Sequence, residues 1–93
     1  MNKYQLLYIV DNALTEEAKN ELVDRFNALI ESLNGTVESV DKWGTKKLAY
    51  EIDGKREGYY VLVKFNAEAT VPAEIERQMK ISDSVVRQMI TRI

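Results

Sequence analysis

Residues 59–65 read YYVLVKF, the strongest strand signal in the chain. Aromatic and β-branched side chains dominate this run, and it contains neither glycine nor proline, which is typical of a strand buried on at least one face. The preceding segment, Asp53–Gly58 (DGKREG), is polar and carries two glycines, so we expect a hairpin loop there. A long strand over residues 36–52 would then pair with residues 59–65 in antiparallel fashion.

The strand over residues 36–52 has an interruption in its pattern. Val37 and Val40 do not share one parity with the later alternation of Leu48, Tyr50 and Ile52. Because a shift of one residue moves every side chain to the other face of a sheet, the pattern predicts a bulge or kink near Trp43-Gly44.

An amphipathic helix is predicted between the first and second strands. Thr15 can cap its first turn, and Glu16 and Glu17 place acids where the helix dipole favours them. Apolar residues recur every three or four positions on one stripe, at Ala18, Leu22, Val23, Phe26, Leu29, Ile30 and Leu33. Asn34-Gly35 supplies the left-handed residue that ends the helix.

The remaining segments complete a repeated pattern. Residues 4–10 (YQLLYIV) predict a first strand, and residues 85–91 predict a last one. A short second helix begins near Pro72, carries Val71, Ile75 and Met79 at steps of four, and ends before Ser82-Asp83. The order is therefore strand, helix, strand, strand, helix, strand.

Two strand-helix-strand units of this size predict one α+β domain over residues 1–93. Right-handed crossovers place the first and third strands in the centre, which gives the antiparallel sheet order 4-1-3-2 with both helices on one face. The other face of the sheet is then uncovered.

Composition narrows the possible functions. The 93 residues include no cysteine and no histidine, which excludes thiol chemistry and removes the commonest general base and metal ligand. The longest apolar run near the start has six residues, far short of a membrane span, so we expect a cytoplasmic protein. A net charge of −2 argues against nucleic-acid binding through bulk charge but allows a local basic face.

The uncovered face is not polar, whichever parity faces the helices. In the first strand Tyr4, Leu6, Tyr8 and Val10 alternate with Gln5, Leu7 and Ile9, and in the third strand Val61, Val63 and Phe65 alternate with Tyr60, Leu62 and Lys64. Scattered apolar residues on a sheet surface are common and can mean little. Because both central strands share the feature, we expect an apolar patch of a few hundred Å², about the size that marks a binding surface.

Basic residues are unevenly distributed. Seven of the 15 acids fall on the predicted helices, whereas five basic residues fall along strands or at their ends: Lys3, Lys46, Lys47, Arg87 and Arg92. One face can therefore be positive, although lysines on edge strands also serve to discourage aggregation.

Two other interpretations, an enzyme and an RNA-recognition module, are not supported by the spacing of the residues. The carboxylate pairs Asp53/Glu57 and Asp41/Glu51 specify no catalytic geometry, and no phosphate-binding glycine loop is present, so we expect no enzyme, metal or cofactor. Residues 56–63 invite comparison with the RNA-recognition module whose third strand stacks bases. An acid precedes the glycine there, and Val61 replaces the second stacking aromatic.

Several motifs together resemble one known family. They are Tyr4, the run GTKKLAYEI at 44–52, GYY at 58–60, KISD at 80–83, and then Val85, Arg87 and Met89. With the strand order and the apolar open face, the chain resembles the bacterial ribosomal protein S6 family over essentially its whole length.

This resemblance implies a non-enzymatic, ferredoxin-like structural protein of the cytoplasmic small ribosomal subunit. Members bind the central domain of 16S ribosomal RNA as a heterodimer with the small basic ribosomal protein S18, without a membrane or a small-molecule substrate. The resemblance further implies that the partner lies against the open face of the sheet. The contact residues would then be Leu7, Ile9, Tyr60, Leu62 and Met89. The resemblance implies phosphate contacts for Lys3, Lys46, Lys47, Arg87 and Arg92.

An alternative of another class stays open. A ferredoxin-like regulatory module could use the same apolar face to pair with a copy of itself or to bind a small effector. A stable homodimer with a buried sheet would favour this alternative.

Overall fold

The structure is a computed structural model that describes residues 1–52 and 54–93, and, of these, the side chains at 49–52 and 55 fall outside the description. Its elements are β1 (Asn2–Asp11), α1 (Glu16–Ser32), β2 (Thr36–Ile52), β3 (Lys55–Ala67), α2 (Val71–Ile81) and β4 (Val85–Arg92). This is the predicted order of elements. Asp53, which was predicted to lie in the hairpin loop, is outside the described residues.

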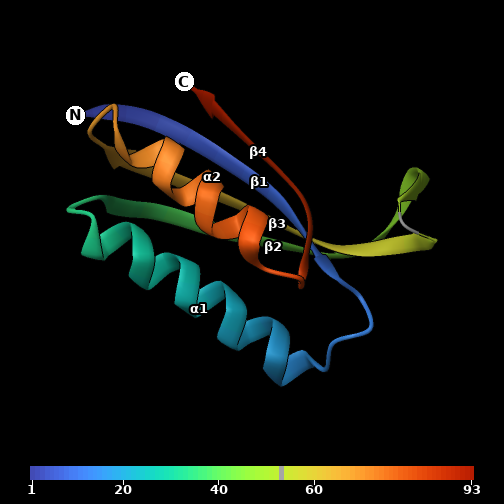
Figure 1. Cartoon of the computed structure of the whole chain (residues 1–93). Coiled ribbons are helices and arrows are strands. Elements are labelled where there is room, and N and C mark those ends of the chain that lie inside the picture. Colours follow the sequence, from blue (N-terminus) through green and yellow to red (C-terminus); the bar gives the residue numbers. More distant parts are fainter. Residues whose placement is uncertain (53) are drawn as a thin grey trace.

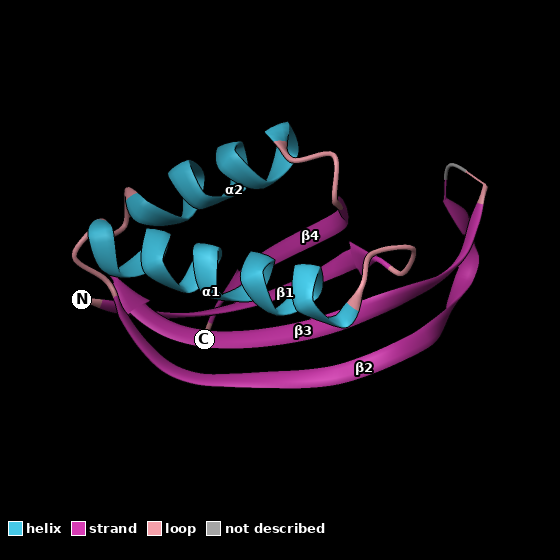
Figure 2. Cartoon of the chain, turned by 90° about the horizontal axis from the view of Figure 1, so that it is seen from below, coloured by secondary structure: helices cyan, strands magenta, loops and turns pink. Residues whose placement is uncertain are grey.

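The four strands form one antiparallel sheet in the order β2-β3-β1-β4. The predicted order 4-1-3-2 is thereby confirmed. Both helices cover the same face of the sheet, and none of the described helices or strands covers the opposite face (Figures 1 and 2). The two central strands, β1 and β3, are the ones whose open side was predicted to be apolar.

The core lies between this sheet and the helices. Tyr4, Leu6, Tyr8 and Val10 of β1 and Val61, Val63 and Phe65 of β3 are all buried, together with Phe26, Ile30, Ile75 and Met79 of the helices. This decides the parity that the sequence left open. Leu7, Ile9, Tyr60 and Leu62 consequently belong to the open face.

Both ends of α1 follow from local hydrogen bonds. The hydroxyl of Thr15 accepts a hydrogen bond from the backbone N–H of Ala18 at 3.2 Å, which confirms the predicted cap. At the other end the left-handed residue is Asn34, with φ 65°, and the N–H of Gly35 donates to the carbonyl of Ile30 at 2.9 Å. A Cβ on Gly35 would lie 2.8 Å from Cγ2 of Ile30, so a glycine is needed beside the turn.

Replacing Thr15 by alanine is expected to lower the free energy of unfolding by about 1 kcal/mol, because the N–H of Ala18 loses its acceptor. Thr15→Ser keeps the hydroxyl and serves as the matched control. Urea titration followed by circular dichroism measures both variants. Equal stability of the alanine and serine variants would show that the cap contributes nothing.

Beyond the pair of Lys46 and Gly58, where the pairing with β1 ends, the β2–β3 hairpin continues past the helices as a two-stranded hairpin arm (Figures 1 and 2). The prediction of a loop over 53–58 is wrong for residues 55–58, which are part of β3. Because none of the described helices covers either side of this arm, its strands need no alternation of apolar residues. Their polar sequence is therefore similar to that of a loop.

The predicted irregularity of β2 is confirmed. Its pairing with β3 shifts register between Lys42 and Gly44, and Gly44 has φ 85°, a conformation that favours glycine. Further shifts occur between Val37 and Ser39 and between residues 47 and 52. The bulge at residue 43 changes which side chains of β2 point to the open face.

Candidate functional site

The open face carries two adjacent rows of side chains across three strands. Leu7 pairs with Leu62 on one side and with Met89 on the other, and Ile9 pairs likewise with Tyr60 and Arg87. Each row therefore runs from β3 through β1 to β4. The structure brings together all five residues predicted to contact a protein partner.

These residues differ in how much they expose. The side chain of Met89 is 49% exposed, Leu7, Tyr60 and Leu62 are half-buried, and Ile9 is only 7% exposed. A shallow hollow of about 210 Å³ is lined by four of them, Leu7, Ile9, Tyr60 and Met89, together with Arg87 and Gln88. We call these five residues, Leu7, Ile9, Tyr60, Leu62 and Met89, the open-face patch.

Ile9 owes its burial to a glycine on the neighbouring strand. A Cβ built on Gly58 would lie 2.2 Å from Cγ2 of Ile9, far inside van der Waals contact. The isoleucine side chain therefore occupies the space that any other residue at position 58 would fill. Ile9 forms the floor of the hollow, whereas Met89 and Leu62 offer more accessible surface.

Trp43 extends this surface, although it was not among the residues predicted to contact a partner. As the extra residue of the β2 bulge, it lies beside Tyr60, with ring centroids 6.4 Å apart and an angle of 10° between the ring planes. The ammonium of Lys46 lies 4.9 Å from the centroid of the Trp43 ring. The signal that could have revealed it is the predicted bulge itself, which turns its extra residue toward the open face.

The five predicted phosphate-contacting residues do not form one cluster. Arg87 borders the hollow and Lys46 lies against Trp43, so both adjoin the open-face patch. Lys47 is the next residue along β2, pairs with Glu57, and therefore points to the opposite face of the hairpin arm. The two neighbouring lysines thus act on different sides of the sheet.

The other two basic residues lie at the far end of the sheet. Lys3 is 3.6 Å from the carboxylate of Glu38, and the guanidinium of Arg92 donates to the side-chain carbonyl of Asn2 at 2.9 Å. Arg92 pairs with Tyr4, whose side chain faces the helices, so Arg92 lies on the helix side of β4. Lys3 and Arg92 therefore bracket the end of β1 at a distance from Lys46.

A polar junction joins the hairpin arm to the start of α1. Lys19 is 6% exposed, donates to the side-chain oxygen of Asn12 at 3.0 Å and lies 5.0 Å from the centroid of the Tyr59 ring. The hydroxyl of Thr45 donates to the same oxygen at 2.8 Å. These contacts hold together the loop after β1, the first turn of α1 and the two strands at the base of the arm. No local sequence pattern indicates this role of Asn12 and Lys19.

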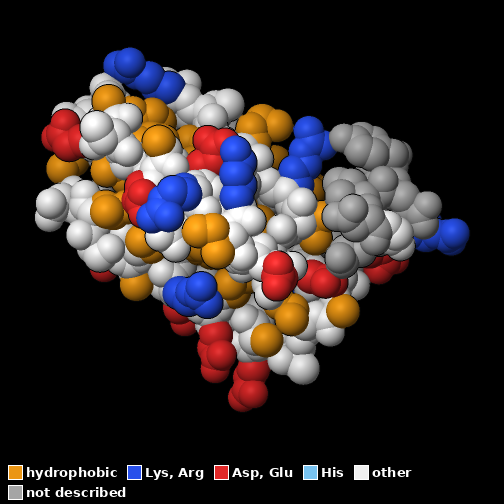
Figure 3. Space-filling view, in the orientation of Figure 1, with side chains coloured by type: hydrophobic (Ala, Val, Ile, Leu, Met, Phe, Trp, Pro, Cys, Tyr) orange, Lys and Arg blue, Asp and Glu red, His pale blue; other side chains and the backbone are white. Residues whose placement is uncertain are grey.

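The helix side has a different character. Figure 3 shows basic and acidic side chains intermixed on it, with acids gathered along the lower edge where α1 lies. Among the described residues, no group of three or more acids, cysteines or histidines is arranged to hold a metal ion. None of the described helices is long and apolar enough to cross a membrane.

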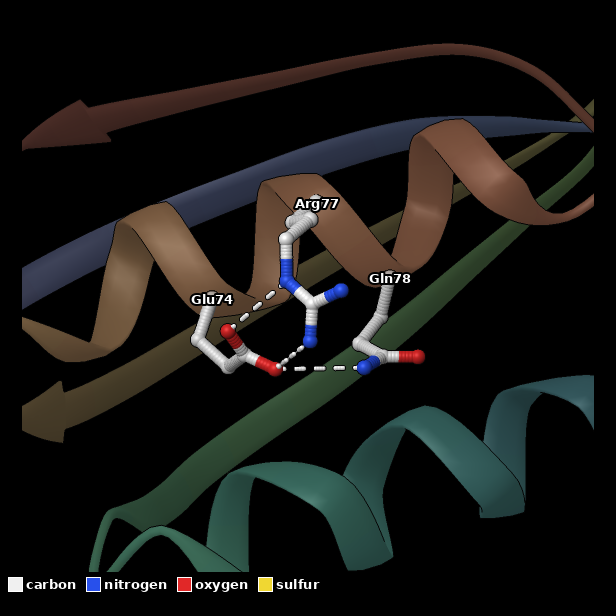
Figure 4. Close-up of polar contacts among 3 residues, drawn as sticks. All are labelled: Glu74, Arg77 and Gln78. Carbon is white, nitrogen blue, oxygen red and sulfur yellow. Dashed lines mark hydrogen bonds and ion pairs between the residues drawn. The ribbon is translucent and has the colours of Figure 1, made fainter.

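One carboxylate with a perturbed pKa belongs to a helix ion pair on this side. Glu74 accepts hydrogen bonds from Nη2 and Nε of Arg77 at 2.6 and 3.1 Å and from Gln78 at 3.1 Å (Figure 4). These bonds lower the pKa of Glu74 to about 2, Arg77 contributing most. The spacing of three and four residues along α2 is that of an ordinary surface pair.

Removing Arg77 should return this carboxyl toward its ordinary pKa of 4.5. Because the folded form lowers the pKa, the stabilisation is present above pH 4.5 and is lost as pH falls toward about 2. NMR titration of the Glu74 carboxyl carbon in Arg77→Gln measures this. Lys80→Gln, which removes a cation paired with Glu76, should leave Glu74 unchanged. An equal shift in both variants would contradict the assignment.

The family model described as Ribosomal protein S6 matches residues 3–92 of the chain. The chain belongs to the ribosomal protein S6 family. Membership confirms the resemblance drawn from the motifs, and it makes the chain a non-enzymatic structural constituent of the small ribosomal subunit in the cytoplasm.

Curated members of the S6 family match over almost their full length. The small ribosomal subunit protein bS6 of Alkaliphilus oremlandii is 52% identical over 93 residues, covering 100% of this chain and 98% of that protein. The bS6 protein of Clostridium acetobutylicum is 49% identical over 90 residues, with 97% and 95% covered.

The S6 fold also appears among solved structures. The 30S ribosomal protein S6 of Thermotoga maritima superposes with a TM-score of 0.95 at 27% identity, covering 99% of this chain and 87% of that one. The C-terminal domain of the MgtC protein from Mycobacterium tuberculosis reaches 0.70 at 8% identity, with 100% and 88% covered. The second likeness concerns the fold alone and shows that this α+β arrangement serves other proteins as well.

Proposed function

We propose that this protein binds the central domain of 16S ribosomal RNA as a heterodimer with the small basic ribosomal protein S18. The observation that carries the proposal is the open-face patch, an apolar surface that crosses three strands on the side that the helices leave uncovered. The resemblance to the S6 family supplies the identity of the partner.

The patch suits a protein partner better than it suits RNA. Its members are aliphatic or aromatic. Moving leucine and methionine side chains out of water lowers the free energy, whereas these side chains offer a phosphate no hydrogen-bond donor. A covered patch would also remove the exposed area at Met89 and Leu62. The same face can thus be buried in the assembly while the helix side stays in contact with solvent.

Charge favours a basic partner. The chain has 15 acidic and 13 basic residues, and this net charge of −2 attracts a basic partner and increases its association rate slightly. Within the heterodimer the partner would supply most phosphate contacts, and this chain would add those of Lys3, Lys46, Lys47, Arg87 and Arg92. Because each neutralised phosphate contributes about one unit to the slope of log K against log salt, few contacts from this chain mean a shallow slope for the chain alone.

Sedimentation velocity tests the partnership. Purified chain and S18 should sediment as one species with one copy of each, while the chain alone stays monomeric. A stable homodimer of the chain alone that S18 does not dissociate would support the alternative of a self-pairing module. The heterodimer proposal would then fail.

A further inference from the structure

Trp43 and Lys46 stand at the rim of the open-face patch, where the hairpin arm begins. We propose that they form a subsite for one unpaired RNA nucleotide, whose base stacks on the indole and whose phosphate binds the ammonium. The proposal rests on the RNA-binding function proposed above and adds to it a contact with a base. Phosphate contacts alone would position the chain without touching any base.

The geometry presents an accessible aromatic surface. The side chain of Trp43 is 44% exposed although one of its neighbours, Tyr60, lies nearly parallel to it. A centroid separation of 6.4 Å exceeds that of full face-to-face overlap, so the two rings are offset and the indole extends beyond the phenol ring. Together the rings form a stepped aromatic surface, of which the indole is the more exposed part.

The neighbouring charge indicates which flat group fits. Lys46 lies 4.9 Å from the indole centroid, which is the range of a cation–π contact and also close enough to reach the phosphate of a nucleotide stacked there. Proteins that bind single-stranded RNA combine aromatic platforms with cations in this way. An apolar partner side chain would fill the platform but would leave the ammonium without an anion.

The surroundings limit the subsite to about one nucleotide. Asp41, two residues before Trp43, pairs with Leu62 and so places a carboxylate on the same face, where it repels a second phosphate. On the other side Lys47 points away from this face. Lys47 therefore offers a matched control, because it has the same charge on the same strand without contact to Trp43.

NMR spectroscopy of the full chain provides the test. Trp43 is the only tryptophan, so one indole N–H signal reports on the platform. Adenylate hexamer RNA should shift the Trp43 ring signals upfield in a saturable way. An abasic ribose-phosphate hexamer with equal charge should not. Trp43→Leu should weaken hexamer binding roughly 10-fold, within the range for loss of one stacked base, and Trp43→Phe should retain part of it.

The lysine pair gives the second arm of the experiment. Lys46→Gln should lower hexamer affinity more than Lys47→Gln, and amide spectra of every variant check that the fold is kept. Equal ring shifts with the abasic hexamer, or equal affinity of wild type and Trp43→Leu, would overturn the subsite. So would loss of the ring shifts once S18 is bound, because the partner would then cover the platform. Failure of the ribosomal function would instead show as absent ribosomal RNA binding in the presence of S18.

Discussion

The double substitution Leu62→Asp and Met89→Asp is expected to weaken S18 binding at least about 100-fold. Each aspartate would bury a carboxylate in the apolar contact with the partner, and Arg87 at the edge of the hollow offsets only part of its lost hydration. An unpaired buried charge costs several kcal/mol, and about 1.4 kcal/mol already corresponds to a tenfold change in affinity. Isothermal titration of S18 into the variant measures the loss.

These two positions leave the core intact. Met89 is 49% exposed and Leu62 is half-buried on the face away from the helices, so a charge there stays in water in the free chain. Ile81→Asp is the matched control, because it makes the same chemical change at a residue 64% exposed on α2. The control should bind S18 like the wild type. Retained binding by the double variant would refute the assignment of the patch to the partner.

Gly58→Ala is expected to lower the free energy of unfolding by about 1–2 kcal/mol. Its Cβ would lie 2.2 Å from Cγ2 of Ile9, a methyl group on the β-carbon that moves only if the χ1 rotamer of this β-branched residue changes. Overpacking of this kind costs about 1–3 kcal/mol. The smaller entropy of the unfolded alanine chain offsets roughly 0.4–1 kcal/mol of that loss. Urea unfolding of the two proteins gives the difference directly.

A double-mutant cycle attributes the effect to this one contact. Ile9→Ala removes Cγ2, so adding Gly58→Ala to it should cost less than adding Gly58→Ala to the wild type, with a coupling of about 1 kcal/mol or more. If the glycine substitution costs the same in both backgrounds, the close approach is not what destabilises the variant.

The fold could be predicted because its helices and central strands carry one-sided apolar patterns. The stripe on α1 and the alternate residues 59, 61, 63 and 65 face the core that the structure shows, and the crossover rule then gave the strand order. The hairpin arm could not be predicted in the same way. Residues 55–58 form part of β3 without an apolar pattern, because backbone pairing rather than burial defines the strand there.

The candidate site was predictable only in outline. The alternation of side chains along the strands predicted that Leu7 and Leu62 share one face. The sequence could not show that Ile9 is buried, because this burial depends on the absence of a side chain at Gly58 on another strand. The bulge at Trp43 similarly decides that Lys46 contacts the indole while Lys47 points the other way. Register across strands is a long-range property, which local patterns do not contain.

The measurement closest to the central claim is a binding titration of a 16S central-domain RNA fragment with the chain, with S18 and with their equimolar mixture. The heterodimer account predicts tight binding by the mixture, and weak binding with a shallow salt dependence by the chain alone. Binding by the isolated chain as tight as that of the mixture, over the same range of salt concentrations, would contradict it.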